Sequence, residues 1–217
     1  ASRGADRISQ LGGRVRAFGR RARVYGECTV SIPQGRTWTE YTNGTQSRIV
    51  CRCVHCGHWV APEREHLTGW QDAATVDANE SAAFVCPDCG AVWSDDDRAQ
   101  ANRDSMLVHR GQEVTPEGKI VGDMPRSDTL GFRWSAANNL FRTAGDAGAE
   151  EWRAQRAADP DAADKALRQW VWAVPYEPPA IDLSGLTSAA IVDRMDERYP
   201  RGIVPPSCKF LTVGCDV

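Results

Sequence analysis

Two short cysteine motifs constrain this chain more than any other feature of its sequence. The segments CVHCG at 53–57 and CPDCG at 86–90 share the pattern C-x-x-C-G, and about thirty residues separate them. Two intervening residues let both sulfurs of a motif face one ion, and the following glycine permits the positive φ that such a turn often needs. Four thiolates match the tetrahedral shell of a structural zinc site. The sequence therefore predicts one zinc ion bound by Cys53, Cys56, Cys86 and Cys89.

Other uses of these cysteines fit the sequence less well. An iron site of the rubredoxin type uses the same motifs, whereas a thioredoxin-like redox motif needs one C-x-x-C in a βαβ context that is missing here. Catalytic zinc is disfavoured because four thiolates leave no open position for water. Cys51 is a surplus cysteine, and His55 and His58 are expected near the site without being ligands. Apolar residues on both sides of each motif predict two short hairpins around the metal.

Composition is ordinary for a soluble globular protein. The 217 residues are 41% hydrophobic and 25% charged, which is enough for a real core. There is no apolar run of the roughly 18–20 residues that a membrane helix needs, and the polar N-terminus does not match a signal peptide. The eight cysteines are therefore expected to stay reduced or to bind metal.

Charge is unevenly distributed along the chain. Residues 1–26 contain seven arginines and one aspartate, and residues 60–104 are acidic. The basic start either faces a polyanion or is a solvated basic surface.

Hydrophobic patterning gives a coarse prediction of the other elements. It predicts a strand over 21–31 that ends near Thr29 and Ser31. It then predicts, in order, a short helix within 98–111, a polar hairpin or loop over 111–122, a strand leading into a short helix over 130–141, helices near 147–158, 161–173 and 187–198, and a final strand within 209–217. Trp152, Trp170 and Trp172 are expected to pack in a core or between helices.

The final strand carries one candidate ligand. Thr212, Gly214 and Asp216 share a face because side chains alternate along a strand. Small residues beside a carboxylate leave room for a hydrated divalent cation. An aspartate that closes a strand is nevertheless usually a turn residue.

The order of these motifs resembles one known family. The chain resembles the large subunit of phage terminase, GpA type, in the order of its segments. These segments are a strand ending in Ser or Thr, the two cysteine motifs, GFRWSAANNLF, WVWAVPYEPP, DERYP and IVPPSCKFLTVGCDV. The resemblance covers the whole chain. It implies a packaging motor in which a P-loop ATPase and a metal-dependent nuclease of the RNase H-like fold move viral DNA into a procapsid and cut the concatemer.

The resemblance also implies a domain arrangement within a mixed α/β fold. Residues 1–48 would be the end of the ATPase sheet, 49–95 a zinc-ribbon insertion, 96–205 a helical connector and 206–217 the first strand of the nuclease. The implied cofactors are structural Zn²⁺, ATP, and Mg²⁺ or Mn²⁺ at the nuclease site. The implied partners are double-stranded DNA, the small terminase subunit and the portal or procapsid. The full-length protein would be a homo-oligomeric motor in the cytoplasm of an infected bacterium, not associated with a membrane.

Two residues acquire roles through the resemblance, and two motifs are missing. Asp216 matches the first metal-binding carboxylate of the nuclease. Thr29 matches the coupling motif, although the family usually has Ser-Thr-Pro where this chain has Cys28-Thr29-Val30. The chain contains no G-x-x-x-x-G-K-[ST] phosphate-binding loop, and no strand ending in the paired acidic residues of a Walker B motif. We therefore expect a fragment of a longer protein that has neither ATPase nor nuclease activity alone.

Two alternatives use the same residues. A stand-alone zinc-ribbon module would bind nucleic acid or protein through its basic start and its tryptophans. A redox protein would use the cysteine pairs and would form reversible disulfides, whereas metal-bound thiolates resist alkylation.

Overall fold

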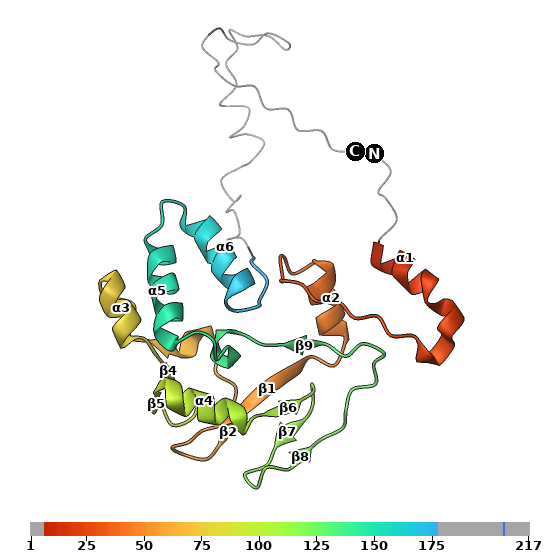
Figure 1. Cartoon of the computed structure of the whole chain (residues 1–217), viewed down its shortest axis with the longest axis horizontal. Coiled ribbons are helices and arrows are strands. Elements are labelled where there is room, and N and C mark those ends of the chain that lie inside the picture. The colour runs from red at the N-terminus through yellow and green to blue at the C-terminus, as the bar shows by residue number, and fades with distance from the viewer. Residues whose placement is uncertain (1–6, 178–205, 207–217) are drawn as a thin grey trace, which may run out of the picture. The chain divides into compact units, whose positions relative to one another are not determined.

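The computed structural model describes residues 7–177 and residue 206 (Figure 1). The chain divides into two compact units, Ala1–Glu177 and Pro178–Val217, and the helices and strands described below belong to the first. The helix predicted over 187–198, the predicted final strand and Asp216 lie outside the described residues.

The larger sheet is built around strand β1 (Ser47–Arg52). β1 pairs antiparallel with β2 (Trp59–Val60) and with β6 (Met106–Val108), and parallel with β9 (Phe132–Arg133). Cys51 lies opposite Val60 in the β1–β2 pair, so the first cysteine motif forms the turn between these two strands.

A smaller sheet contains the second motif. β4 (Ala83–Val85) lies between β3 (Leu67–Thr68) and β5 (Val92–Trp93), antiparallel to both. The second motif forms the β4–β5 turn, because Val85 pairs with Val92. A separate hairpin consists of β7 (Glu113–Val114) and β8 (Ile120–Val121).

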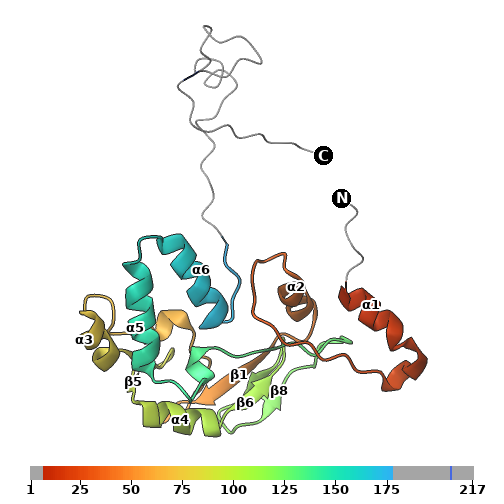
Figure 2. The same ribbon diagram turned by 45° about the horizontal axis from the view of Figure 1, so that its top comes forward.

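Helices flank these sheets and precede them (Figures 1 and 2). The α-helices are α1 (Arg7–Arg14), α2 (Arg36–Asn43), α3 (Thr75–Ser81), α4 (Asp95–Arg103), α5 (Ala144–Gln155) and α6 (Pro160–Trp170). The 3-10 helices within residues 7–177 are η1 (Arg16–Arg21), η2 (Arg64–His66) and η3 (Ala136–Asn138).

Local sequence explains where the later helices begin. Ser94 and Asp97 form a capping box at the start of α4. Thr143 and Asp146 do the same for α5. Each satisfies backbone N–H groups that have no partner within the helix. α6 begins with Pro160 after the N-cap Asp159, because proline lacks the N–H that a first turn leaves unpaired.

The core has two parts. One lies beneath α3, α5 and α6 and is centred on the buried side chains of Leu67, Phe84, Leu167 and Trp172. The other surrounds the cysteines and includes Val60, Trp93 and Ala101. β4 and β5 join the two, since Phe84 on β4 belongs to the first part and its pairing partner Trp93 on β5 to the second.

Several predicted elements are confirmed. The two hairpins at the cysteine motifs, the hairpin within 111–122 and the strand followed by a short helix within 130–141 are present. The helices predicted near 147–158 and 161–173 are α5 and α6, each beginning earlier because of its cap. Trp172 is fully buried, and Trp152 is half-buried with its indole N–H donating to the Ala73 carbonyl.

Two expectations were wrong, and a third was right only in part. Residues 22–32 form neither strand nor helix, because no described strand pairs with them and Tyr25 is 82% exposed. Thr29 therefore lies in an exposed irregular segment and not at a strand end. The short helix expected within 98–111 is present as α4, but it ends at Arg103, and Met106–Val108 pairs with β1. Trp170 is 73% exposed and does not pack in a core.

Candidate metal centre

The two cysteine motifs adopt the same turn. In the first, the N–H of Cys53 donates to the His58 carbonyl and the N–H of Gly57 donates to the Cys53 carbonyl, each at 2.9 Å. In the second, the equivalent bonds run from Cys86 to Ala91 at 2.9 Å and from Gly90 to Cys86 at 3.0 Å. Gly57 and Gly90 have φ values of 76° and 70°, a conformation that glycine adopts without steric cost.

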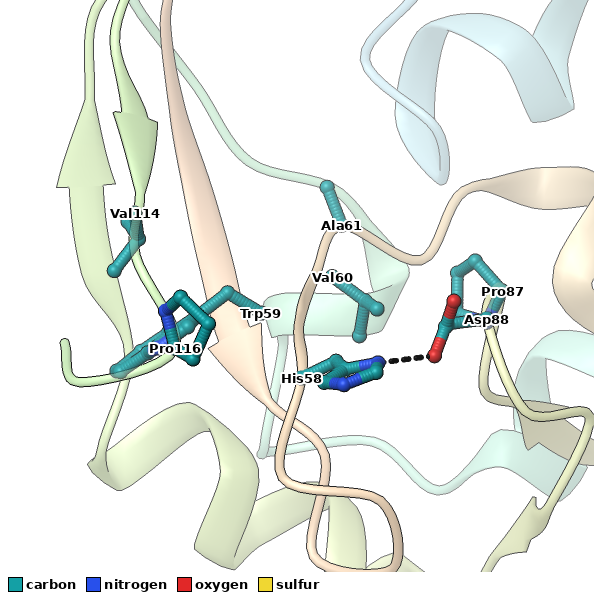
Figure 3. A pocket seen from close by; sticks show the side chains of 8 residues that line it. All are labelled: His58, Trp59, Val60, Ala61, Pro87, Asp88, Val114 and Pro116. Atoms are coloured by element: carbon teal, nitrogen blue, oxygen red, sulfur yellow. Dashed lines mark hydrogen bonds and ion pairs between the residues drawn. The ribbon is translucent and has the colours of Figure 1, made fainter. Parts of the chain in front are cut away.

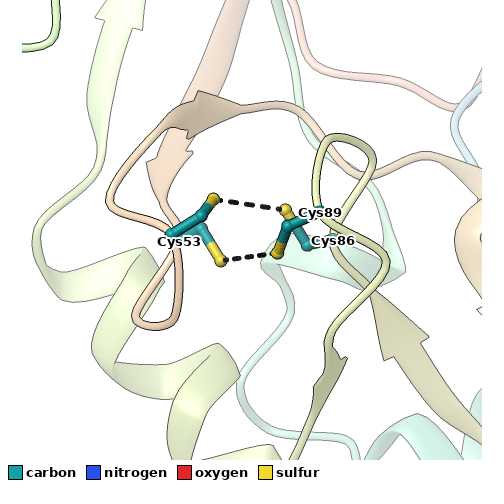
Figure 4. A group of neighbouring side chains, drawn as sticks. Cys53, Cys86 and Cys89 are labelled. Atoms are coloured by element: carbon teal, nitrogen blue, oxygen red, sulfur yellow. Dashed lines mark hydrogen bonds between the residues drawn. The ribbon is translucent and has the colours of Figure 1, made fainter.

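The turns bring four sulfur atoms together (Figure 4). The Sγ atoms of Cys53 and Cys89 are 4.0 Å apart, as are those of Cys56 and Cys86. All four lie within 4.8 Å of one another. A disulfide would need about 2.05 Å, and all four are free thiols. A tetrahedral ion with Zn–S bonds of about 2.3 Å places its sulfurs about 3.8 Å apart. The spacing therefore suits four ligands of one metal ion.

Electrostatics favour a cation among these sulfurs. Burial opposes ionisation of Cys53, but the N–H groups of Cys56 and His55 lower its pKa to about 6. The N–H of His58 favours the Cys56 thiolate, yet burial and the neighbouring thiols together raise the pKa of Cys56 to about 12. Burial raises the pKa of Cys86. One thiol thus ionises readily, and further thiolates need a positive charge between them.

Trp93 contributes a buried donor beside this group. The residue is 1% exposed, and its indole N–H forms no hydrogen bond of regular geometry with the described residues. The same N–H helps to lower the pKa of Cys53. A buried donor next to sulfur is expected where that sulfur carries negative charge, which fits a metal-bound thiolate.

The surplus cysteine and the two histidines lie outside the four-sulfur group. Cys51 is 1% exposed, and burial raises its pKa to about 12, so its thiol is inert. His55 Nε2 lies 3.7 Å from Asp97 Oδ2. His58 Nδ1 lies 2.5 Å from Asp88 Oδ2, and this contact links the first motif to the second.

The contact between His58 and Asp88 was not predicted from the sequence. It could have been suspected, because Asp88 lies inside the second motif and His58 directly follows the first. The two side chains lie at one side of an open pocket of about 470 Å³ whose other lining residues are mostly apolar (Figure 3). That lining comprises Trp59, Val60, Ala61, Pro87, Val114 and Pro116. The Sγ of Cys56 also lies 3.8 Å from Asp88 Oδ2.

Of the other two predicted site residues, the structure describes only Thr29. Thr29 is exposed, and the neighbouring Cys28 contacts Thr37 through an Sγ–Oγ1 distance of 2.5 Å. Asp216 lies outside the described residues.

Comparison with known families decides the identity of the chain. The family model for the phage terminase large subunit gpA, ATPase domain, matches residues 1–111, which is just over half of the 217 residues. The chain belongs to this family. The match begins at the arginine-rich start and includes all four cysteines of the metal centre. No curated protein and no solved structure matches the chain significantly.

Membership confirms the resemblance over residues 1–111. A gpA-type ATPase domain indicates a component of a DNA-packaging motor and indicates the use of ATP. Within residues 7–177, no helix has the length and hydrophobicity needed to cross a membrane.

Proposed function

We propose that this chain is the part of a terminase large subunit in which a four-cysteine zinc module connects the ATPase region to a nuclease. The observation that carries the proposal is that one family match spans both the arginine-rich start and the cysteine group. On this proposal, residues 1–48 end the ATPase domain, 49–95 form the zinc ribbon, 96–205 form the connector and 206–217 begin the nuclease.

Zinc has a structural role in this proposal. Bound to Cys53, Cys56, Cys86 and Cys89, it would neutralise the thiolates and cross-link the β1–β2 and β4–β5 turns. The turns themselves are preorganised by their backbone hydrogen bonds. The module would brace its neighbours, because both turns continue directly into strands of the two sheets.

Motor activity would need chain segments besides these 217 residues. ATP would bind at a phosphate loop that this sequence does not contain. Thr29 would belong to the segment that couples hydrolysis to movement, and Asp216 would hold one of two Mg²⁺ or Mn²⁺ ions at the nuclease site. Double-stranded DNA, the small subunit and the portal would be the partners of a homo-oligomeric motor in the host cytoplasm.

Metal analysis and two activity assays test the proposal. We expect one zinc ion per purified chain, protection of four thiols from alkylation, no ATP turnover and no Mg²⁺- or Mn²⁺-dependent nicking of plasmid DNA. Reversible disulfides between the motifs in place of bound metal would instead support a redox protein. Turnover of ATP or DNA by this chain would overturn its assignment to a non-catalytic region of the motor.

A further inference from the structure

The arginine-rich start packs against nothing in the described structure. From Gln10 to Thr29 no residue is buried. Its larger apolar side chains are exposed too, including Phe18 at 59% and Tyr25 at 82%. Residues 7–26 contain six arginines and no acidic residue. Within the described residues this segment is thus not held in place by a core, and its charged side chains are accessible.

The arginines of this segment differ from six others in the chain. Arg36, Arg64, Arg98, Arg133, Arg142 and Arg168 each form an ion pair with a carboxylate. Arg14, Arg16, Arg20 and Arg21 are exposed and form no ion pair within the described part of the chain. Arg23 directs its guanidinium to the carbonyls of Arg20 and Ala22, and no carboxylate neutralises it. Five uncompensated positive charges therefore lie within ten consecutive residues.

We propose that residues 14–23 form a phosphate-contacting surface for double-stranded DNA. This inference rests on the proposed function, which makes duplex DNA the polyanion that the chain meets. Duplex DNA presents about one negative charge per 1.7 Å of its axis, and arginine binds phosphate oxygens through a planar fork of donors. The surface contains no acidic residue that would repel the backbone.

The acidic start of α4 does not suit the same ligand. Asp95, Asp96 and Asp97 form its first turn. Asp95 accepts from Arg98 and from the N–H of Ala144, and Asp97 completes the cap with Ser94. These carboxylates stabilise the protein, and their charge disfavours phosphate near the metal centre. We therefore assign DNA contact to the arginine segment and not to the zinc module.

Counterion release predicts how strongly DNA binding should depend on salt concentration. Each phosphate contact with B-DNA contributes about −0.9 to the slope of log K against log salt concentration. Five contacts would give a slope of about −4.5, and loss of two arginines would change it by about 1.8. Contacts to phosphate alone carry no base information, so affinities for unrelated duplex sequences should be equal.

The experiment measures binding of the whole 217-residue chain to a fluorescein-labelled 30-base-pair duplex by anisotropy between 25 and 200 mM NaCl. The test variant is Arg20→Gln/Arg21→Gln. The matched control is Arg126→Gln/Arg153→Gln, which removes two exposed arginines elsewhere. All three proteins are checked for zinc content and circular dichroism, which neither variant should change because these side chains are exposed.

We expect the test variant to have a salt slope about 1.8 shallower than that of the unmodified chain. Its affinity should fall equally for unrelated duplex sequences, and the control variant should have the slope and affinity of the unmodified chain. Equal slopes for both variants, or no duplex binding at 25 mM NaCl, would overturn the inference. Preferential binding of an acidic polypeptide over duplex DNA would also overturn it. Zinc binding without DNA binding would refute this inference alone, whereas DNA binding without zinc would refute the proposed metal centre alone.

Discussion

Cys51 and Cys86 are both almost fully buried thiols, at 1% and 2% exposure. Cys51 faces Val60 within the β1–β2 pair, whereas Cys86 begins the second turn and lies 4.0 Å from the sulfur of Cys56. Burial alone therefore does not mark a ligand. The turn after each cysteine does, because it curls the backbone so that two sulfurs face one point.

This difference gives a matched pair of substitutions. We expect Cys86→Ser to abolish binding of the single zinc ion, since a neutral hydroxyl is a poor replacement for a thiolate. Cys51→Ser should retain one zinc ion per chain. Metal analysis after gel filtration measures both. Retained zinc in Cys86→Ser together with lost zinc in Cys51→Ser would mean that the ligand set is wrong.

Two neighbouring carboxylates on α5 differ in burial. The Glu151 side chain is 3% exposed, pairs with Arg64 through two bonds of 2.7 Å and accepts from the Trp172 indole at 2.6 Å. Glu150 pairs with Arg142 at 2.8 Å on the surface, where its side chain is 33% exposed. Water therefore screens the second pair more than the first, in which only the Arg64 side chain is partly exposed.

Charge removal at the two positions should therefore have unequal effects. Glu151→Gln should lower the free energy of unfolding by about 2–3 kcal/mol, less than a fully buried pair loses, because Asp164 still pairs with Arg64. Glu150→Gln should lower it by under about 1 kcal/mol. Urea unfolding of zinc-loaded protein measures both values. Equal losses would contradict the burial difference on which the prediction rests.

At the scale of elements, α3 and α5 approach closely through small residues. Gly145, Ala147 and Gly148 of α5 are buried, as is Ala78 of α3. A Cβ added at Gly148 would overlap the Cβ of Ala82. Glycine costs a helix interior about 1 kcal/mol relative to alanine, so its presence here reflects the space available between the helices.

Alanine at this position should destabilise the protein despite its better helix propensity. We expect Gly148→Ala to cost about 1–3 kcal/mol through overpacking. Gly12→Ala is the control, because Gly12 lies in α1 and nothing surrounds a Cβ added there. Gly12→Ala should leave the unfolding temperature unchanged, since α1 has no packed face among its described side chains. Thermal unfolding that shows no loss for Gly148→Ala would contradict the close approach of α3 and α5.

Prediction from sequence succeeded for elements whose signals are local. The cysteine motifs and the hydrophobic patterning of α5 and α6 act within a few residues, and each gave the right element. Prediction failed where a segment distant in the sequence determines which structure forms. Residues 22–32 alternate like a strand, but no strand among residues 7–177 pairs with them. Met106–Val108 is a strand because β1 lies beside it. The hydrogen bond between His58 and Asp88 joins motifs about thirty residues apart, and sequence spacing alone does not place these motifs in contact.

At the scale of the molecule, α4 connects the metal centre to the helices. It begins at Asp95, two residues after β5 ends at Trp93. Arg98 is 3% exposed and donates to the carbonyls of Ala136, Asn139 and Arg142. Asp95 accepts from the first N–H of α5, at Ala144. The segment that closes the second cysteine turn thus also fixes the start of α5.

Metal removal should therefore affect more than the cysteine turns. Because zinc binding energy is folding energy in such modules, chelation should remove amide hydrogen-exchange protection and protease resistance from residues 50–95. Protection should also fall in α5, since Asp95 and Arg98 lose the position from which they hold its first turn. α1 is an internal control, because its exposed amides should exchange rapidly with or without metal. Mass spectrometry of the exchanged chain, with and without chelator, resolves the three regions. Full protection of α5 beside an unfolded 50–95 segment would show that the helices are stable without the zinc module. Unchanged protection in all regions would show that residues 50–95 fold without a metal ion.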